Sequence, residues 1–192
     1  MKKCAMFLVL STFLLGAMTS CEKEEPKKEE TFDTYAASGV ENGHDYVDLG
    51  LSVKWAVNTI DEPFTEDTGW YVEGEKRDKL AASWGGNWRL PTEGELWELA
   101  LFCEWDLIWK NGRPGARITS KVNGKSIFVP MAYTGEMSSN PDMDVVCIWS
   151  NEELDFSSPL PMGTALYYVP YVADEQFYIP NAICAAICMV LD

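Results

Sequence analysis

Residues 84–105 read WGGNWRLPTEGELWELALFCEW, and after Pro91 their apolar positions take on a helical period. Four apolar residues recur three or four positions apart and would share one helix face: Leu96, Leu99, Ala100 and Cys103. Thr92 and Glu95 form a T-x-x-E capping box, in which each side chain accepts a hydrogen bond from the other's backbone N–H. The pattern predicts a helix over residues 92–103, and it is the one helix that we predict.

Other segments carry strand patterns. Residues 45–57 (DYVDLGLSVKWAV) alternate apolar and polar positions around Gly50, which predicts a strand, a bend and a second strand. Asn123-Gly124 separates two β-rich runs, and this dipeptide favours a type I′ hairpin turn because that turn needs positive φ twice. Further strands are expected at 147–150, 164–172 and 182–191, the last of them buried. The chain therefore reads as α+β, with mostly antiparallel strands.

The first twenty residues have a different pattern. Lys2 and Lys3 precede an uncharged run from Cys4 to Ser20, and the chain becomes polar at Glu22. This run is shorter than the ~20 apolar residues of a typical spanning helix, and its charge layout is that of a signal peptide. We therefore interpret residues 1–20 as a signal peptide and not as a permanent membrane span.

Met18-Thr19-Ser20-Cys21 resembles the lipobox that lipoprotein signal peptidase reads, although Leu is more usual than Met at its first position. The resemblance implies that Cys21 carries lipid and becomes the first residue of the mature protein. Several acyl chains, at about 0.8 kcal/mol per buried methylene, would anchor the protein stably without spanning the membrane. Ordinary secretion with cleavage nearby is the alternative, and it leaves the compartment unchanged.

Residues 22–30 (EKEEPKKEE) are too charged to bury a core, so residues 21–39 are expected to form the lipidated cysteine and a disordered tether. Acidic residues soon after the lipid cysteine resemble the surface-export signal of Bacteroidetes lipoproteins. We favour the outer face of the outer membrane, with a plain linker in the periplasm as the alternative. Residues 40–192 have the length of one ordinary domain.

Charge narrows the set of partners. The chain has a net charge of −15, and because residues 1–20 hold two lysines and no acid, the rest carries −17. Nucleic acid and anionic lipid are poor partners for such a surface, so contact with the membrane is expected through the lipid alone. We expect no cofactor and no metal.

Several motifs occur in the order found in one family: HDYVDLGLSVKWA (44–56), GWYVEGE (69–75), DKLAASWGGNWRLPTEGELWEL (78–99), ITSKVNGKSIFVP (118–130), IWSNE (148–152) and ALYYV (165–169). Together they resemble the Fibrobacter succinogenes major paralogous domain family, which is common among Bacteroidetes lipoproteins. The resemblance implies a C-type-lectin-like fold, related to that of formylglycine-generating enzymes. It implies no particular reaction, because scaffold and chemistry separate freely.

The sequence departs from the family in two places. Val57-Asn58-Thr59-Ile60 replaces a Thr-Cys-Asn-Val-Gly run, so a cysteine that might pair with Cys103 is absent. Residues 184–190 (CAAICMV) replace a Gly-x-Ser-Val-Arg-Pro-Val pattern and lose its glycine and arginine. The pairing of Cys103, Cys147, Cys184 and Cys188 stays open.

Catalytic interpretations are weaker. Residues 89–100 look like the signature helix of formylglycine-generating enzymes, which hold copper with two cysteines, but Cys184 and Cys188 at strand spacing would lie roughly 13 Å apart. His44, the single histidine, has Asp45 beside it, and neighbouring residues of a strand point to opposite faces. We interpret His44 as a surface residue at a strand start.

Two further motifs suggest hydrolase or lectin chemistry. The acid pairs Glu93/Glu95, Glu152/Glu153 and Asp142/Asp144 suit glycoside hydrolysis in type, but 30 acids make such pairs expected by composition. Trp149-Ser150-Asn151-Glu152 resembles the Trp-Asn-Asp calcium motif of sugar-binding C-type lectins, with Ser150 interrupting it. We favour a buried Trp149 with Ser150 ending its strand.

Eight tryptophans are many for one domain, and an indole face can stack on a sugar or on an apolar side chain. Trp55, Trp88 and Trp149 match core positions of the family. Trp97 lies off the helix's apolar stripe, while Trp105 and Trp109 fall in a loop-like segment, 104–112. These last three are our candidate ligand contacts, although packing against neighbouring loops is the stronger alternative.

The sequence thus favours a surface-tethered, non-catalytic binding or adhesion module whose ligand is a glycan or a partner protein. A structural subunit of a fimbrial-type surface assembly is the alternative, and an oxidase or hydrolase comes third. A binding module should present a pocket or aromatic shelf, whereas an assembly subunit should show an open strand edge or an extended apolar patch.

Overall fold

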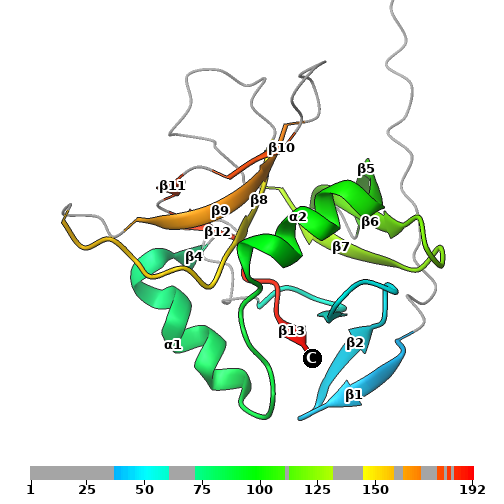
Figure 1. Ribbon diagram of the computed structural model, residues 1–192, viewed down its shortest axis with the longest axis horizontal. Helices are drawn as coiled ribbons and strands as arrows, with labels where there is room; N and C mark the ends of the chain where they lie inside the picture. The colour runs from blue at the N-terminus through cyan, green and yellow to red at the C-terminus, as the bar shows by residue number, and fades with distance from the viewer. Residues whose placement is uncertain are drawn as a thin grey trace, which may run out of the picture.

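The computed structural model describes residues 37–60, 72–110, 113–131, 145–157, 162–169, 177–179, 181–182 and 184–192. These residues form two helices and thirteen short strands, and the strands pair antiparallel (Figure 1). The α+β class is therefore as predicted. The predicted signal peptide at 1–20, Cys21 and most of the tether at 21–39 lie outside the described residues. Within the described ranges, neither helix has the length and apolar character that crossing a membrane requires.

The first sheet has the order β1-β2-β3-β13. Its strands are β1 (Gly39–Glu41), β2 (His44–Val47), β3 (Lys54–Ala56) and β13 (Val190–Leu191). Tyr46 pairs with Ala56 across β2 and β3, and Gly50 lies between these strands with a φ of 71°. The strand, bend and second strand predicted around Gly50 are confirmed.

Of the three Asn-Gly dipeptides in the sequence, the described residues include Asn42-Gly43 and Asn123-Gly124, and these two form different turns. Asn42 and Gly43 have φ values of 50° and 85° between the paired residues Glu41 and His44, which is the two-residue turn with positive φ twice. At the second dipeptide only Gly124 has a positive φ, and residues 121–124 form a longer loop closed by the Ser120 N–H bonded to the Lys125 carbonyl at 2.8 Å. The hairpin at 116–130 is confirmed, but its predicted type I′ turn is wrong.

A three-stranded sheet follows helix α2 (Glu93–Phe102) without a break. Its strands are β5 (Cys103–Lys110), β6 (Arg113–Ser120) and β7 (Ser126–Pro130). All eight residues of β5 pair with β6, from Cys103 opposite Ser120 to Lys110 opposite Arg113. The prediction of a loop-like segment at 104–112 is therefore wrong for most of its length.

The remaining strands form two further groups. They are β8 (Val146–Trp149), β9 (Gly163–Tyr168), β10 (Phe177–Tyr178) and β11 (Asn181–Ala182), with β4 (Val72–Glu73) and β12 (Cys184–Ala185) as a separate pair. The apolar run 182–191 is buried as predicted at the residues whose burial is described, but it is not one strand. It passes from β9 to β4 to β3, as the pairings of Ala182 with Gly163, Cys184 with Glu73 and Val190 with Trp55 show.

Helix α1 (Gly74–Trp84) is a helix that the sequence analysis did not predict. Its sequence GEKRDKLAASW begins with glycine and charged residues, and apolar residues at helical spacing do not appear before Leu80. Its guanidinium at Arg77 is 2% exposed, donates to the Ser150 carbonyl at 3.1 Å and lies over the ring of Trp149. A charged residue such as Arg77 is expected on the surface. Because it is buried instead, the inward face of α1 cannot be recognised from an apolar pattern in the sequence.

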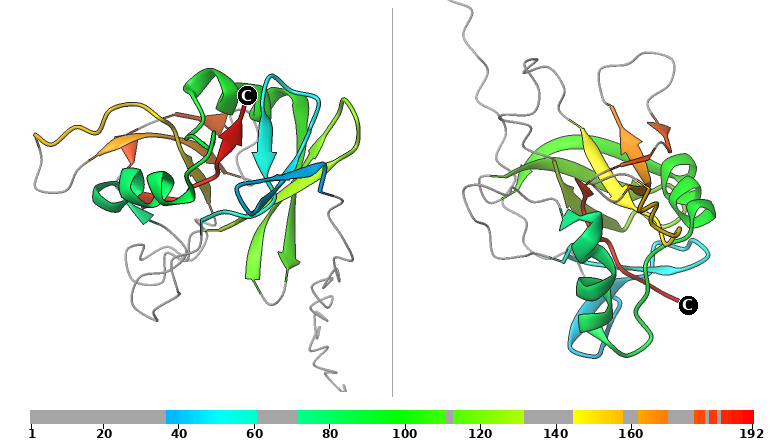
Figure 2. Two further views of the ribbon diagram at one scale, coloured as in Figure 1. Left: turned by 90° about the horizontal axis from the view of Figure 1, so that it is seen from below. Right: turned by 90° about the vertical axis from the view of Figure 1, so that its left-hand side faces the viewer.

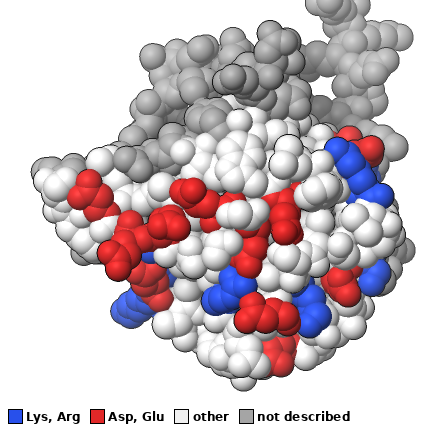
Figure 3. Space-filling view, viewed as in Figure 1, with Lys and Arg blue, Asp and Glu red and all other residues white. Residues whose placement is uncertain are grey.

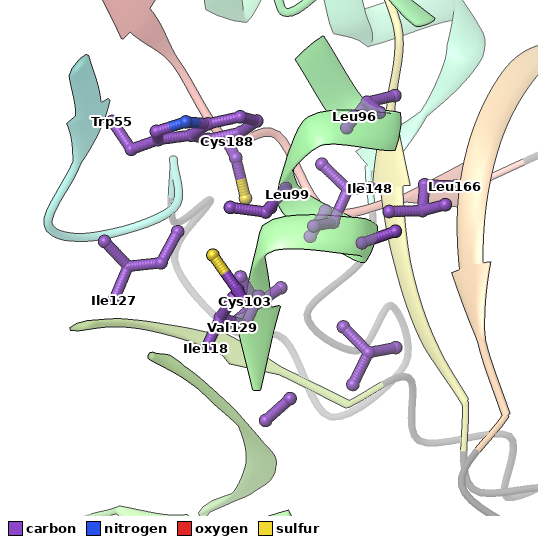
Figure 4. Packing of buried hydrophobic residues seen from close by; sticks show 14 of the residues in the cluster. Trp55, Leu96, Leu99, Cys103, Ile118, Ile127, Val129, Ile148, Leu166 and Cys188 are labelled. Carbon is purple, nitrogen blue, oxygen red and sulfur yellow. The ribbon is translucent and has the colours of Figure 1, made fainter. Parts of the chain in front are cut away.

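Helix α2 contacts β9 on one side and β5 and β6 on the other, so it joins the two main groups of strands (Figures 1 and 2). Ten of the buried side chains that meet there are labelled in Figure 4: Trp55, Leu96, Leu99, Cys103, Ile118, Ile127, Val129, Ile148, Leu166 and Cys188. Leu96, Leu99, Ala100 and Cys103 are all buried, which confirms the predicted stripe. The burial of this face fixes which residues α2 turns outward.

Candidate functional site

The first turn of α2 is held by a complete capping box. The Glu95 N–H donates to Thr92 Oγ1 at 3.2 Å, and the Thr92 N–H donates to Glu95 Oε2 at 2.7 Å. Arg89 donates two further hydrogen bonds to the Glu95 carboxylate and also reaches the carboxylate of Asp192. The start of the helix is thereby tied both to the preceding segment and to β13's end, and the rest of α2 has a fixed orientation.

The outer face of α2, which we define as Trp97, Leu101 and Phe102, lies opposite the buried stripe. Their side chains are 38%, 63% and 51% exposed, respectively. Trp97 and Leu101 are one turn apart and so adjacent on the helix surface. Phe102 lies about 100° further round the helix than Leu101, with Glu98 between the two, so the face consists of the apolar pair Trp97 and Leu101 and of Phe102 on the other side of Glu98. These exposed apolar side chains mark a candidate interaction site.

Residues that flank this face keep its backbone in place. Lys121 donates from its backbone to the Phe102 carbonyl at 2.9 Å and from Nζ to the Leu101 carbonyl at 3.3 Å, so the β6–β7 loop satisfies the end of the helix. On the other side, Glu98 accepts a hydrogen bond from the Ser52 N–H at 2.9 Å. The outer face therefore sits on a supported helix and not on a free loop.

Sequence reasoning identified one member of the outer face, Trp97, and missed two. Leu101 and Phe102 were not predicted, because candidate contacts were sought among the tryptophans. The signal was available, since Leu101 follows Trp97 by four residues and projects from the same side of the helix. A pair of apolar residues outside the buried stripe is the pattern that would have indicated the outer face.

Trp105 is not an exposed loop residue. It is half-buried on β5, its Nε1 donates to the Leu99 carbonyl at 3.2 Å, and its ring centroid lies 4.9 Å from that of Tyr168 and 5.1 Å from that of Phe177. Tyr168 in turn donates its hydroxyl to the Trp105 carbonyl at 3.2 Å. Trp105 therefore packs β5 against β9 and β10, and we assign it a structural role.

Trp109 lies near the end of β5 opposite Pro114 and is half-buried. It follows Cys103 by six residues on the same face of β5, well beyond the end of α2. The structure thus separates the three predicted contacts: Trp97 is on the outer face of α2, Trp105 in the packing beneath it, and Trp109 at the far end of β5. They do not form one shelf.

His44 begins β2, as predicted, but it is half-buried and not simply a surface residue. Its ring stacks on that of Trp84 with 3.9 Å between centroids and 2° between planes, and Trp88 meets Trp84 edge-on at 5.0 Å. Asp45 is exposed on the opposite face of the strand. The ring contacts of His44 with Trp84 and Trp88 are those of aromatic packing.

The segment compared with a calcium motif is built into the fold. Trp149 and Ser150 are fully buried, and Ser150 Oγ donates to the Thr164 carbonyl at 2.9 Å, so Ser150 follows the end of β8 as we favoured. Within the ranges that the structure describes, no group of three or more His, Cys, Asp or Glu side chains is placed to hold a metal ion.

The thiols of Cys103 and Cys188 are free and buried in the same core, where Figure 4 shows both sulfurs beside Leu99. Burial raises the pKa of Cys103 to about 11, against a smaller lowering by Lys121, and burial raises the pKa of Cys188 further still. Both thiols are protonated at neutral pH, which does not suit a nucleophile or a metal ligand.

The acid pairs lie in different surroundings. Glu95 is engaged by Arg89 and Thr92, whereas Glu93 next to it is not part of that network. Glu152 and Glu153 are exposed on the loop after β8. Asp142 and Asp144, like Trp70, lie outside the described residues.

Comparison of the chain with models of protein families, with curated proteins and with solved structures finds no match in any of the three. The resemblance to a lipoprotein domain family therefore stays a prediction from the quoted motifs. Functional inference has to start from the outer face of α2.

Proposed function

We propose that this protein is a surface-tethered, non-catalytic binding or adhesion module whose ligand is a glycan or a partner protein. One observation carries the proposal: three large apolar side chains, Trp97, Leu101 and Phe102, are exposed on a helix that is otherwise fixed by capping, burial and flanking hydrogen bonds. Apolar surface in water is less favourable than the same surface buried, by about 25 cal/mol per Å². Contact with a ligand would bury these side chains and recover that free energy.

The proposed location rests on the first thirty residues. The uncharged run after Lys3 and the Met18-Thr19-Ser20-Cys21 sequence support export and lipidation at Cys21, and the charged segment that follows supports a tether. We place the protein on the outer membrane, facing the cell exterior. A C-type-lectin-like fold and membership of the Fibrobacter succinogenes major paralogous domain family belong to the same proposal, and the antiparallel strands around α2 are compatible with both.

A structural subunit of a surface assembly is the second candidate, and β5 favours it. Among the described strands β5 pairs with β6 alone, so from Cys103 to Ile108 no described strand covers its other edge. Two exposed acids, Glu104 and Asp106, occupy that strand, and charged side chains on an edge oppose strand addition. The binding module is the better supported function.

The test is to screen the purified full-length protein on an array of glycans and of extracellular proteins. We expect at least one ligand whose binding is lost in the double variant Leu101→Ser/Phe102→Ser. Phe156→Ser is the matched control, because Phe156 is 69% exposed on the loop between β8 and β9. A ligand that the control loses equally, or an array without any ligand, contradicts the proposal. Chemical conversion of a bound ligand, seen by mass spectrometry, contradicts its non-catalytic part.

A further inference from the structure

Acidic side chains border the outer face of α2. Glu93 lies one helical turn before Trp97, Glu98 lies beside Leu101 across the helix surface, and Glu104 is exposed on the strand that follows. Lys121 brings one positive charge to this border. In Figure 3, viewed as Figure 1, acidic side chains run as a band across this side of the molecule, with several Lys and Arg side chains below the band and uncharged surface around it.

This charge distribution distinguishes among possible occupants of the face. A second copy would bring the same acidic border and a net charge of −15 to the contact, so self-association is opposed. Anionic lipid is repelled in the same way. A segment that carries Lys or Arg beside its apolar side chains would instead bury those apolar side chains on the outer face of α2. Its cations would be attracted by the acidic side chains at the border.

The composition of the face favours a polypeptide over a sugar. Sugars stack on flat aromatic faces, but the most exposed member here, Leu101, has a branched aliphatic side chain and offers no ring. Neighbouring Leu, Phe and Trp side chains are the kind of surface against which an amphipathic segment lays its apolar side. Protein interfaces also place an aromatic residue such as Trp97 within an apolar centre and charged groups at the rim.

We infer that the outer face of α2 docks a polypeptide segment whose apolar side chains are flanked by Lys or Arg. This inference rests on the proposed binding function and narrows its ligand to one class. The apolar side chains of the segment contact Trp97, Leu101 and Phe102, and its cationic groups lie near Glu93, Glu98 and Glu104.

Three synthetic peptides test the pairing with the full-length protein. The first is a short amphipathic peptide of Leu and Lys, the second has Glu in place of every Lys, and the third keeps Lys but has Ser in place of every Leu. Calorimetry should show binding of the first with a Kd at least about tenfold lower than that of either control. Equal binding of the first and third peptides would mean that net charge alone attracts them, and would overturn the inference.

Variants locate the contact. Leu101→Ser/Phe102→Ser should weaken the Leu/Lys peptide by about tenfold or more, and Glu93→Gln/Glu104→Gln should weaken it less and reduce its salt dependence. Phe156→Ser should bind as the unaltered protein does. Far-UV circular dichroism of each variant verifies that it is folded. Loss of binding in Phe156→Ser, or none in the Leu101/Phe102 variant, would overturn the assignment to this face.

The outcome also separates this inference from the proposed function. If the Leu/Lys peptide fails while an arrayed glycan binds and is lost in the Leu101/Phe102 variant, the module binds sugar and the inference about peptide is wrong. If neither peptide nor array gives a ligand, both fall. Sedimentation of the full chain as a dimer that Leu101→Ser/Phe102→Ser dissociates would identify a second copy as the occupant and would also overturn the inference.

Discussion

The guanidinium of Arg89 holds the carboxylate of Glu95 with two hydrogen bonds, from Nη1 to Oε2 at 2.9 Å and from Nη2 to Oε1 at 2.7 Å. The same guanidinium donates to Asp192 at 2.6 Å, so the start of α2 and the residue after β13 share one cation. Arg89 and the start of β13 are further joined by the backbone pair between Arg89 and Val190. The outer face of α2 depends on this arrangement for its orientation.

We predict that acid weakens the fold through Glu95. Burial alone would raise the pKa of Glu95, but the side-chain hydrogen bonds from Arg89 and the backbone bond from Thr92 outweigh it and lower the pKa from its ordinary value of 4.5. Because the folded-state pKa is the lower one, the stabilisation is complete above the ordinary value and is lost as pH falls through the folded-state pKa. Urea unfolding at neutral pH and in acid measures the loss.

Glu95→Gln should show a smaller fall in unfolding free energy between the two pH values than the unaltered protein. Glu93→Gln is the matched control, since it removes a carboxylate from the same turn without touching Arg89, and it should leave the fall nearly unchanged. If both variants changed the acid response equally, general charge and not the Arg89 pair would be responsible.

A second prediction concerns the other half of the capping box. Thr92→Ala removes the oxygen that accepts from the Glu95 N–H and should lower the unfolding free energy by about 1 kcal/mol. Thr92→Ser keeps that oxygen and should recover most of the loss. Denaturation midpoints and slopes of the three proteins decide the matter, and equal values for Thr92→Ala and the unaltered protein would mean that the cap contributes nothing.

The features that were predictable from sequence depend on residues close together in the chain. Thr92 and Glu95 are three residues apart, so the capping box and the helical period that follows could be read directly. The hairpin around Asn123-Gly124 was read from local signals as well, yet its turn type was not. A four-residue loop joins the two strands instead. Its first residue, Lys121, also donates a hydrogen bond to the end of α2, and this contact lies outside the hairpin.

The features that were missed depend on distant partners. Tyr168, which covers Trp105, lies 63 residues further along the chain, so the environment of Trp105 cannot be read from its neighbours. Its strand was readable, however, because apolar and acidic residues alternate from Cys103 to Leu107, before Ile108 interrupts the alternation. The run 182–191 is apolar throughout, and a pattern without polar positions cannot show where a chain leaves one sheet for another.

The different surroundings of two tryptophans give a third prediction. Trp105→Ala removes a ring packed against Tyr168 and Phe177 and should cost about 3 kcal/mol of unfolding free energy, the lower end for a large aromatic residue because Trp105 is half-buried. Trp97→Ala should change stability by no more than about 0.5 kcal/mol, as exposed substitutions do. Equal losses in urea unfolding would show that Trp97 belongs to the core and would remove it from the outer face.

The fourth prediction is that Cys21 is acylated in the mature protein. The observation behind it is the Met18-Thr19-Ser20-Cys21 sequence at the end of an uncharged run. Mass spectrometry of protein extracted from membranes should find an N-terminal cysteine that carries acyl chains. Cys21→Ser should release the protein from the membrane fraction, and a mature N-terminus elsewhere without acyl mass would contradict the prediction.

The fifth prediction concerns the contact between the β1–β2 turn and the end of α1. Asn42 Nδ2 donates to the Trp84 carbonyl, Trp88 Nε1 donates to the Glu41 carbonyl at 2.9 Å, and His44 stacks on Trp84. The chain must turn sharply between the two tryptophans to allow this, and Gly86 does so with a φ of 61°. A Cβ added to Gly86 would lie 3.0 Å from both the Asn42 Cβ and a Glu41 carboxylate oxygen.

Gly86→Ala should therefore lose stability for two reasons, the positive φ at about 1–2 kcal/mol and the crowding against Asn42 in addition. Gly43→Ala separates them, because Gly43 has a φ of 85° but no heavy atom within 4 Å of an added Cβ. We expect Gly86→Ala to be the more destabilising of the two in urea unfolding, and to disturb the tryptophan fluorescence through Trp84 and Trp88 while Gly43→Ala leaves it unchanged. Equal losses and equal spectra would mean that the turn and the end of α1 do not press on each other.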